Sequence, residues 1–304
     1  MGQSADKRNI TIGCTAAIAS TTIFGFSFLF TKNATEQASP FALLAWRYFV
    51  AAILISICAA AGILKINLKG KPLKPLLLIV LFCPVIYFIG ETFGISKTTA
   101  SESGAFVACI PVFSLIASTL ILKKRPTRVQ VAGILITLIG VLFTVFAAGM
   151  SASFSAAGYA ALLIAVVSYP LYSVSVEKTE VYTGEEITFV MQISGAVVFL
   201  IIALAESCIN RNISGFLSLP FANRDFLVAC LYKGVCCSIL AFFLQTVAIS
   251  KVGVNRSSSF VGIGTVVSII SSVIILKEPF TAYQIIGVAL ILAGVYIANI
   301  KIRR

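Results

Sequence analysis

The stretch TFGISKTTASESGAFVACIPVFSLIASTLILKKRPTRVQVAGILITLIGVLFTVF, at positions 92–146, recurs at positions 246–300 as TVAISKVGVNRSSSFVGIGTVVSIISSVIILKEPFTAYQIIGVALILAGVYIANI. The two stretches align without a gap, and about a third of their positions are identical. The matches pair Lys97 with Lys251, and they align a Gln and two Gly residues in the same register. An apolar composition alone would not produce this combination. The chain therefore contains an internal repeat, with a shift of about 154 residues between its copies.

The composition around this repeat is that of a membrane protein. Of the 304 residues, 59% are hydrophobic and 11% are charged, and the mean hydropathy is +1.03. A soluble globular chain is about 45–50% apolar and about 25% charged. These values exclude a cytosolic enzyme, a nucleic-acid-binding domain and a disordered chain. The chain has no histidine, the commonest metal ligand and proton shuttle, and we expect neither a metal nor a cofactor.

Ten apolar segments are long enough to cross a bilayer as helices, since one crossing takes roughly 20 residues. They are uniformly apolar, whereas barrel strands alternate polar and apolar residues. The predicted segments are Ile10–Phe30, Phe41–Leu64, Leu73–Ile95, Ser103–Leu122, Val129–Ala148, Ala157–Val176, Ile187–Ala205, Phe226–Ile249, Ser257–Leu276 and Tyr283–Ile300. This pattern predicts an all-α membrane protein with ten transmembrane helices.

The basic residues predict its orientation, because Lys and Arg concentrate on the cytoplasmic side. With the N-terminus inside, the inner segments hold Lys7, Arg8, Lys65, Lys69, Lys71, Lys74, Lys123, Lys124, Arg125, Arg128, Lys178, Lys251, Arg256, Lys301, Arg303 and Arg304. The outer segments hold only Lys32, Lys97, Arg211, Arg224 and Lys277. Both termini are therefore predicted to be cytoplasmic. Because each repeat has an odd number of spans, the two five-helix units, 1–150 and 151–304, are predicted to be inverted relative to each other.

Several local motifs and the duplicated unit resemble the drug/metabolite transporter superfamily, specifically its ten-helix EamA-type proteins. The motifs are Ile23-Phe24-Gly25-Phe26-Ser27, Pro40 followed by Arg47, Pro111-Val112-Phe113, Lys277-Glu278-Pro279, and Gln284 followed by Gly287 and Gly294. The resemblance covers nearly the whole chain. It implies two EamA-type repeats, alternating access, and export or exchange of small metabolites.

Three charges lie deep in the apolar segments, where each costs about 2.5–3.5 kcal/mol on insertion scales. Glu91 is interpreted as a proton site or an anchor for a substrate ammonium, against a carboxylate that reaches interfacial water. Lys233, placed in the inner third of its segment, is a candidate anion site, against snorkelling to the headgroups. Arg47 is interpreted mainly as a structural charge.

The resemblance implies that the third, fourth, eighth and ninth segments line the pathway. Repeat mates meet around a midplane site in inverted-repeat transporters, and Glu91 aligns with Gln245. The predicted substrate-binding residues are Glu91, Lys233, Gln245, Tyr87, Phe88, Phe242, Ser114, Ser268 and Thr265, with Phe106 as a further aromatic candidate, although a Phe stripe is more often packing. The predicted hinges are Pro84, Pro111, Gly262 and Gly264, since Pro breaks helical hydrogen bonds.

Together these features predict a secondary transporter, an exporter or exchanger, of small polar organic metabolites such as amino acids. No G-x-x-x-x-G-K-[ST] motif occurs, so ATP hydrolysis is not expected. An enzyme is not expected either, because the chain has no histidine and no paired catalytic acids within its apolar segments. An organic-cation or multidrug exporter remains an alternative, as does a non-transporting receptor or assembly protein. The expected partners are a small-molecule substrate, the lipid bilayer of the cell membrane and protons as a candidate coupling ion, without nucleic acid. A monomer and a homodimer both remain open.

Overall fold

The computed structural model describes residues 2–98, 100–149, 155–275 and 282–299, and every regular element in these ranges is helical. The predicted boundary between units at 150–151, the Lys277-Glu278-Pro279 motif, and Lys301, Arg303 and Arg304 lie outside them. The helices are α1 (Gly2–Gln37), α2 (Pro40–Ala60), α3 (Leu73–Val80), η1 (Leu81–Ile86), α4 (Tyr87–Lys97), α5 (Ala100–Val107), α6 (Ile110–Ile121), α7 (Arg128–Gly149), α8 (Ala156–Lys178), α9 (Gly184–Ile209), α10 (Ile213–Ala222), α11 (Arg224–Leu231), η2 (Tyr232–Ala241), α12 (Phe242–Val252), α13 (Val254–Ser259), α14 (Val261–Ile275) and α15 (Ala282–Asn299).

Seven helical stretches of the described residues are long and apolar enough to cross a membrane. They are Arg8–Gln37, Pro40–Ala60, Leu73–Lys97, Ala156–Lys178, Gly184–Ile209, Arg224–Val252 and Val254–Ile275. The predicted fourth, fifth and tenth segments contain shorter apolar helices, 110–121, 128–143 and 285–298. α10 lies in what the sequence presents as a loop, where Asn212 caps the new helix by accepting a hydrogen bond from the Gly215 N–H.

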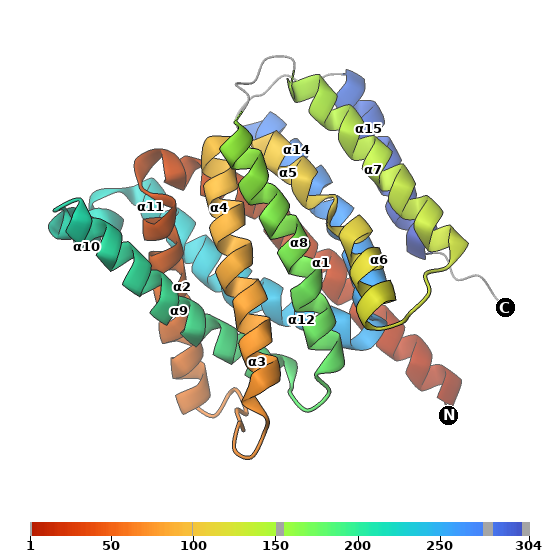
Figure 1. Cartoon of the computed structure of the whole chain (residues 1–304), viewed down its shortest axis with the longest axis horizontal. Helices are drawn as coiled ribbons and strands as arrows, with labels where there is room; N and C mark the ends of the chain where they lie inside the picture. The colour runs from red at the N-terminus through yellow and green to blue at the C-terminus, as the bar shows by residue number, and fades with distance from the viewer. Residues whose placement is uncertain (1, 99, 150–154, 276–281, 300–304) are drawn as a thin grey trace.

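The helix contacts recur with the repeat shift. α1 packs against α12 and α14, and α8 packs against α4 and α6. α1 and α8 begin the two halves, and the repeat shift places α4 on α12 and α6 on α14, so each first helix packs against the same pair of helices from the other half. α2 packs against α9, and α7 packs against α15, so these counterparts contact each other directly. Figure 1 shows α7 and α15 side by side at one edge of the bundle.

Glycines allow the main chains of α7 and α15 to come into direct contact. A Cβ on Gly133 would lie 2.6 Å from the Gly294 carbonyl oxygen, and one on Gly140 would lie 2.7 Å from that of Gly287. In the repeat alignment Gly133 matches Gly287 and Gly140 matches Gly294. Gly133 therefore contacts the repeat equivalent of Gly140, and Gly140 contacts the repeat equivalent of Gly133. Such reciprocal contacts are typical of a two-fold arrangement.

Carboxylates link the loops at one end of the bundle, which is called the basic end because its loops hold most of the Lys and Arg residues. Glu186 accepts a hydrogen bond from the Lys71 ammonium at 2.6 Å and another from the Asn67 N–H at 3.0 Å. Glu177 pairs with Lys124 and accepts a hydrogen bond from the Val254 N–H at 2.6 Å. Loops from both halves of the chain therefore meet at this end.

The third and eighth predicted segments are irregular at matching positions. η2 (232–241) is π-helical, and η1 (81–86), which the shift of the repeat places on 235–240, is a kink between two helical stretches. In η1, Cys83 has extended backbone angles ahead of Pro84, which cannot donate a backbone hydrogen bond. The Phe82 carbonyl oxygen instead accepts a hydrogen bond from the Ser168 hydroxyl of α8 at 2.6 Å.

Candidate functional site

A cavity of about 40 Å³ lies among α1, α2, α4, α5, α6, α8, η2, α12 and α14. Its walls are mostly aromatic and aliphatic, with few polar groups, as is typical of small-molecule sites. The lining residues are Thr21, Phe24, Gly25, Ser27, Phe28, Arg47, Tyr87, Phe88, Glu91, Val107, Ile110, Tyr169, Cys237, Phe242, Val261, Gly264 and Thr265. Both halves of the chain contribute to this lining.

Glu91 supplies the carboxylate of this cavity. It lies one turn after Tyr87 on α4, so both side chains occupy the same face of the helix. The Tyr87 hydroxyl donates a hydrogen bond of 2.7 Å to Glu91 Oε1. Glu91 is only 6% exposed, so its carboxylate is buried within the bundle.

Arg47 supplies a guanidinium to the same cavity from α2, and it is completely buried. Its Nε and Nη2 atoms donate to the Ser238 hydroxyl of η2, at 3.2 Å and 2.9 Å. The guanidinium carbon lies 4.2 Å from the centre of the Phe88 ring, a cation–π distance. Nη1 is buried without a hydrogen-bond partner.

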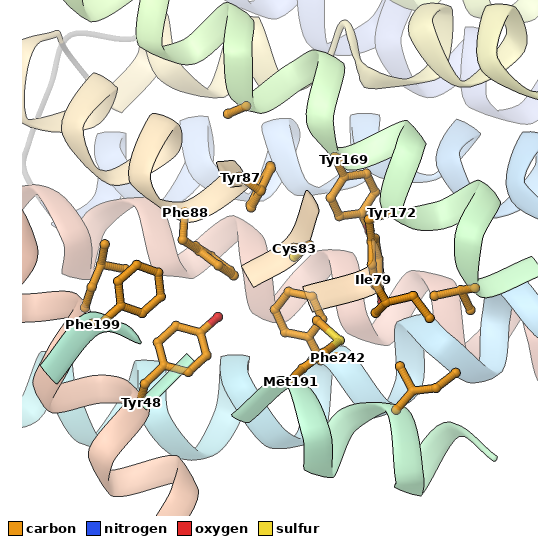
Figure 2. Close-up of a cluster of buried hydrophobic side chains, with 14 of the residues drawn as sticks. Tyr48, Ile79, Cys83, Tyr87, Phe88, Tyr169, Tyr172, Met191, Phe199 and Phe242 are labelled. Carbon is orange, nitrogen blue, oxygen red and sulfur yellow. The ribbon is translucent and has the colours of Figure 1, made fainter. Parts of the chain in front are cut away.

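Aromatic rings from α1, α4, α8 and α12 form the apolar wall. Phe88 and Phe242 occupy equivalent positions of the repeat, and their ring centres lie 5.7 Å apart in an edge-to-face arrangement. Phe242 also meets Phe24 of α1 at 5.2 Å, and Tyr87 meets Tyr169 of α8 at 5.3 Å. Figure 2 shows Phe88, Phe242 and the Tyr87–Tyr169 pair arranged around Cys83.

The EamA-like transporter family model matches the chain twice, over residues 11–146 and 156–300. The chain belongs to the EamA-like transporter family. It is therefore a multi-pass integral membrane protein of a transporter family, and its curated relatives point to a cell membrane.

Two relatives and one solved structure place this EamA-like protein among known proteins. It is 31% identical over 291 residues to the uncharacterized transporter YcxC of Bacillus subtilis (strain 168), covering 95% of this chain and 93% of that one. It is 24% identical over 200 residues to a probable terminal-alkyne amino-acid exporter of Streptantibioticus cattleyicolor, covering 66% and 64%. A crystal structure with 18% identity superposes with a TM-score of 0.71 over 96% of both chains, which shows the fold alone.

Lys233 of this EamA-like protein lies outside the cavity lining. Its side chain is 1% exposed, and its ammonium donates a hydrogen bond to the Thr31 hydroxyl near the end of α1. The sequence placed Lys233 in the inner third of its segment with snorkelling as the alternative. The structure shows a buried side chain and not one that snorkels, and it lies near the α1–α2 connection, away from the basic end.

The other predicted polar residues divide between the cavity and the helix packing around it. Thr265 lines the cavity and donates to the Gly104 carbonyl oxygen at 3.3 Å. Gln245 lies outside the lining and accepts a hydrogen bond of 2.8 Å from Ser20 of α1, while its Nε2 has no partner. Ser114 and Ser268 are buried outside the lining, and the Ser114 hydroxyl has no partner.

Tyr87, Phe88 and Phe242 line the cavity as predicted candidates, whereas Phe106 stacks on Tyr159 at 5.3 Å outside it. The sequence did not identify Tyr169, which lines the cavity, or Ser238, whose hydroxyl accepts hydrogen bonds from Arg47. Extending the repeat alignment toward the N-terminus would have aligned Ser238 with Pro84, inside the two irregular segments.

The four predicted hinge residues lie at different kinds of position. Pro84 lies within the irregular η1 segment, and Pro111 lies in the first turn of α6, after the break between α5 and α6. Gly264 lines the cavity where α14 approaches the Thr21 carbonyl of α1. Gly262 faces Ile291 and Val295 of α15. Whether these residues act as hinges stays a prediction.

Proposed function

We propose that this protein is a secondary transporter, an exporter or exchanger, that moves small polar organic metabolites such as amino acids by alternating access. The observation that carries this proposal is the cavity between helices of both halves, with the Glu91 carboxylate in an apolar surrounding. A buried ionisable group in a membrane protein is costly, so it is retained where a substrate, an ion or a partner uses it. Family membership supports transport as the general activity.

The topology that we propose has ten spans in two inverted five-helix units, 1–150 and 151–304, with both termini in the cytoplasm. The packing of α1 against α12 and α14, and of α8 against α4 and α6, supports this arrangement. The reciprocal glycine contact of α7 with α15 also supports it. The concentration of Lys and Arg in the loops of the basic end supports a cytoplasmic location for that end.

Amino acids lead the substrate classes for two reasons. One relative that aligns with two thirds of the chain is named as a probable amino-acid exporter. The cavity also combines charged groups with an apolar wall, which suits a small polar head on an apolar body. Protons are the proposed coupling ion because Glu91 is a carboxylate with a single hydrogen bond to the Tyr87 hydroxyl.

Export of organic cations is the second candidate, and a specific observation favours it. Glu91 and the rings of Phe88 and Phe242 line the same cavity, and a cation is attracted both to a carboxylate and to the face of a ring. This candidate and the leading one differ in whether the substrate carries a carboxylate.

The test uses the full-length protein in proteoliposomes with an imposed pH gradient. A thermal-shift screen against a metabolite panel first identifies ligands, since a ligand that binds the folded state raises its apparent stability. Uptake of those ligands is then measured for the wild type, for Glu91→Gln, and for Glu180→Gln as an exposed control. We expect Glu91→Gln alone to abolish the pH dependence. Unchanged pH-dependent uptake would refute the proton role, and a lack of uptake of every ligand would refute transport.

A further inference from the structure

The guanidinium of Arg47, a residue that lines the cavity, has one donor without a hydrogen-bond partner. The Ser238 hydroxyl accepts hydrogen bonds from Nε and Nη2, and the Phe88 ring covers the face of the guanidinium. Nη1 is buried and has no hydrogen-bond partner. Arginine is always charged in proteins, so the group cannot lower this cost by losing a proton. Buried polar groups generally have hydrogen-bond partners, so the unpaired Nη1 leaves this guanidinium with capacity for another acceptor.

Arg47 and Glu91 line one cavity without neutralising each other. Among the described residues, ion pairs join Lys71 to Glu186 and Lys124 to Glu177, and none joins Arg47 to Glu91. Glu91 has one hydrogen bond, from Tyr87. The cavity therefore presents a positive group from α2 and a negative group from α4, each with capacity left for a ligand.

We propose that Arg47 binds the carboxylate of the substrate and Glu91 binds its ammonium, so that the site selects a zwitterion with an apolar side chain. Arg47 thus becomes a specificity-determining residue instead of a structural charge. Phe24, Phe88 and Phe242 form the wall that receives the apolar side chain. This assignment rests on the proposed transport function and narrows its substrate class.

The charge arrangement separates the zwitterion from its rivals. A simple organic cation pairs with Glu91 but leaves Arg47 Nη1 unpartnered and faces its positive charge. A simple carboxylate pairs with Arg47 but faces the negative charge of Glu91. A zwitterion satisfies both groups, and a site built around polar partners rejects analogues that lack one of them.

The experiment uses matched ligand sets, such as L-leucine, L-leucinamide and 4-methylpentanoate, with alanine and phenylalanine sets of the same design. Binding to the purified full-length protein is measured at pH 6.5, where the amides are mainly cationic. We expect a zwitterion to bind at least tenfold more tightly than its amide or its deaminated acid. Equal affinity for zwitterion and amide, or no binding of any zwitterion, would overturn the proposal.

Variants then assign each end of the ligand to its residue. Arg47→Gln is expected to weaken binding of leucine and 4-methylpentanoate at least tenfold, with little effect on leucinamide. Glu91→Gln is expected to weaken leucine and leucinamide and to spare 4-methylpentanoate. Arg224→Gln and Glu180→Gln, which change exposed charges, are the controls. The reversed pattern, or equal losses for all three ligands, would refute the assignment.

A second variant covers the case in which Arg47→Gln does not fold. Ser238→Ala keeps the guanidinium and removes the hydroxyl that positions it, so leucine affinity should fall while leucinamide affinity stays. The outcome is also separable from the transport proposal. Transport of ligands that lack a carboxylate, with zwitterions ignored, would refute the Arg47 role and leave transport standing.

Discussion

The η1–α4 segment and the η2–α12 segment are equivalent parts of the two halves, yet they do different work. Both begin in an irregular stretch, a kink in η1 and a π-helix in η2, and the alignment matches Cys83 with Cys237 and Phe88 with Phe242. The positions around these matches differ: Pro84 with Ser238, Gly90 with Leu244, and Glu91 with Gln245. Glu91 faces the cavity, whereas Gln245 bonds to α1. The repeat therefore preserves the scaffold, and the charges that define the site break its symmetry.

The largest expected effect comes from giving α4 the residue of its counterpart, as Gly90→Leu. A Cβ at Gly90 would lie 2.5 Å from the Ala161 carbonyl oxygen of α8, so the α4–α8 contact could not close. We expect a loss of about 3 kcal/mol or more in the free energy of unfolding, measured by denaturation in detergent. Ala165→Gly should not rescue it, because the clash is with the main chain. A Gly90→Leu protein of normal stability would contradict this close approach.

The second prediction moves the carboxylate between the two halves. Glu91→Gln should slow transport about tenfold to a hundredfold, since hydrogen bonds to charged groups contribute about 1.5–3 kcal/mol. Adding Gln245→Glu should not restore it, because position 245 lies outside the cavity lining. Initial rates in proteoliposomes check both variants. Recovery in the double variant would mean that the two positions are interchangeable after all.

The third prediction tests the contact between matched rings with a double-mutant cycle. Phe88→Ala and Phe242→Ala should each destabilise the protein, and the double variant should lose less than the sum. We expect a coupling of about 0.5–1.5 kcal/mol, the usual value for an edge-to-face pair. The Phe106–Tyr159 stack provides the comparison pair outside the cavity. Strict additivity of Phe88→Ala and Phe242→Ala would show that the rings do not interact.

The smallest effect is expected at Gln245→Leu. The change removes the hydrogen bond from Ser20, but it also removes the unpartnered Nε2 donor, and Ser20 keeps its bond to the Ala17 carbonyl oxygen. These contributions oppose each other, so the free energy of unfolding should change by about 1 kcal/mol or less. Transport should persist. A loss of transport with intact stability would give Gln245 a role in the pathway that its geometry does not suggest.

The sequence predicted the apolar segments, the repeat and the position of Glu91 deep in an apolar segment, because these depend on composition and spacing. It did not predict the place of Arg47, because a single arginine in an apolar run carries no periodicity that shows which side it faces. The burial of Lys233 depends on a contact with Thr31, about 200 residues away in sequence. The π-helical stretch at 232–241 contains no proline, so no local signal announced it.

The two ion pairs at the basic end have a consequence for the energy barrier of the proposed alternating access. Under the proposed alternating access, opening that end means separating Glu186 from Lys71 and Glu177 from Lys124. The carboxylates of these pairs are mostly buried, with Glu186 2% and Glu177 11% exposed, and salt screens buried or partly buried pairs much less than exposed ones. The contribution of these two pairs to the barrier should therefore depend only weakly on ionic strength.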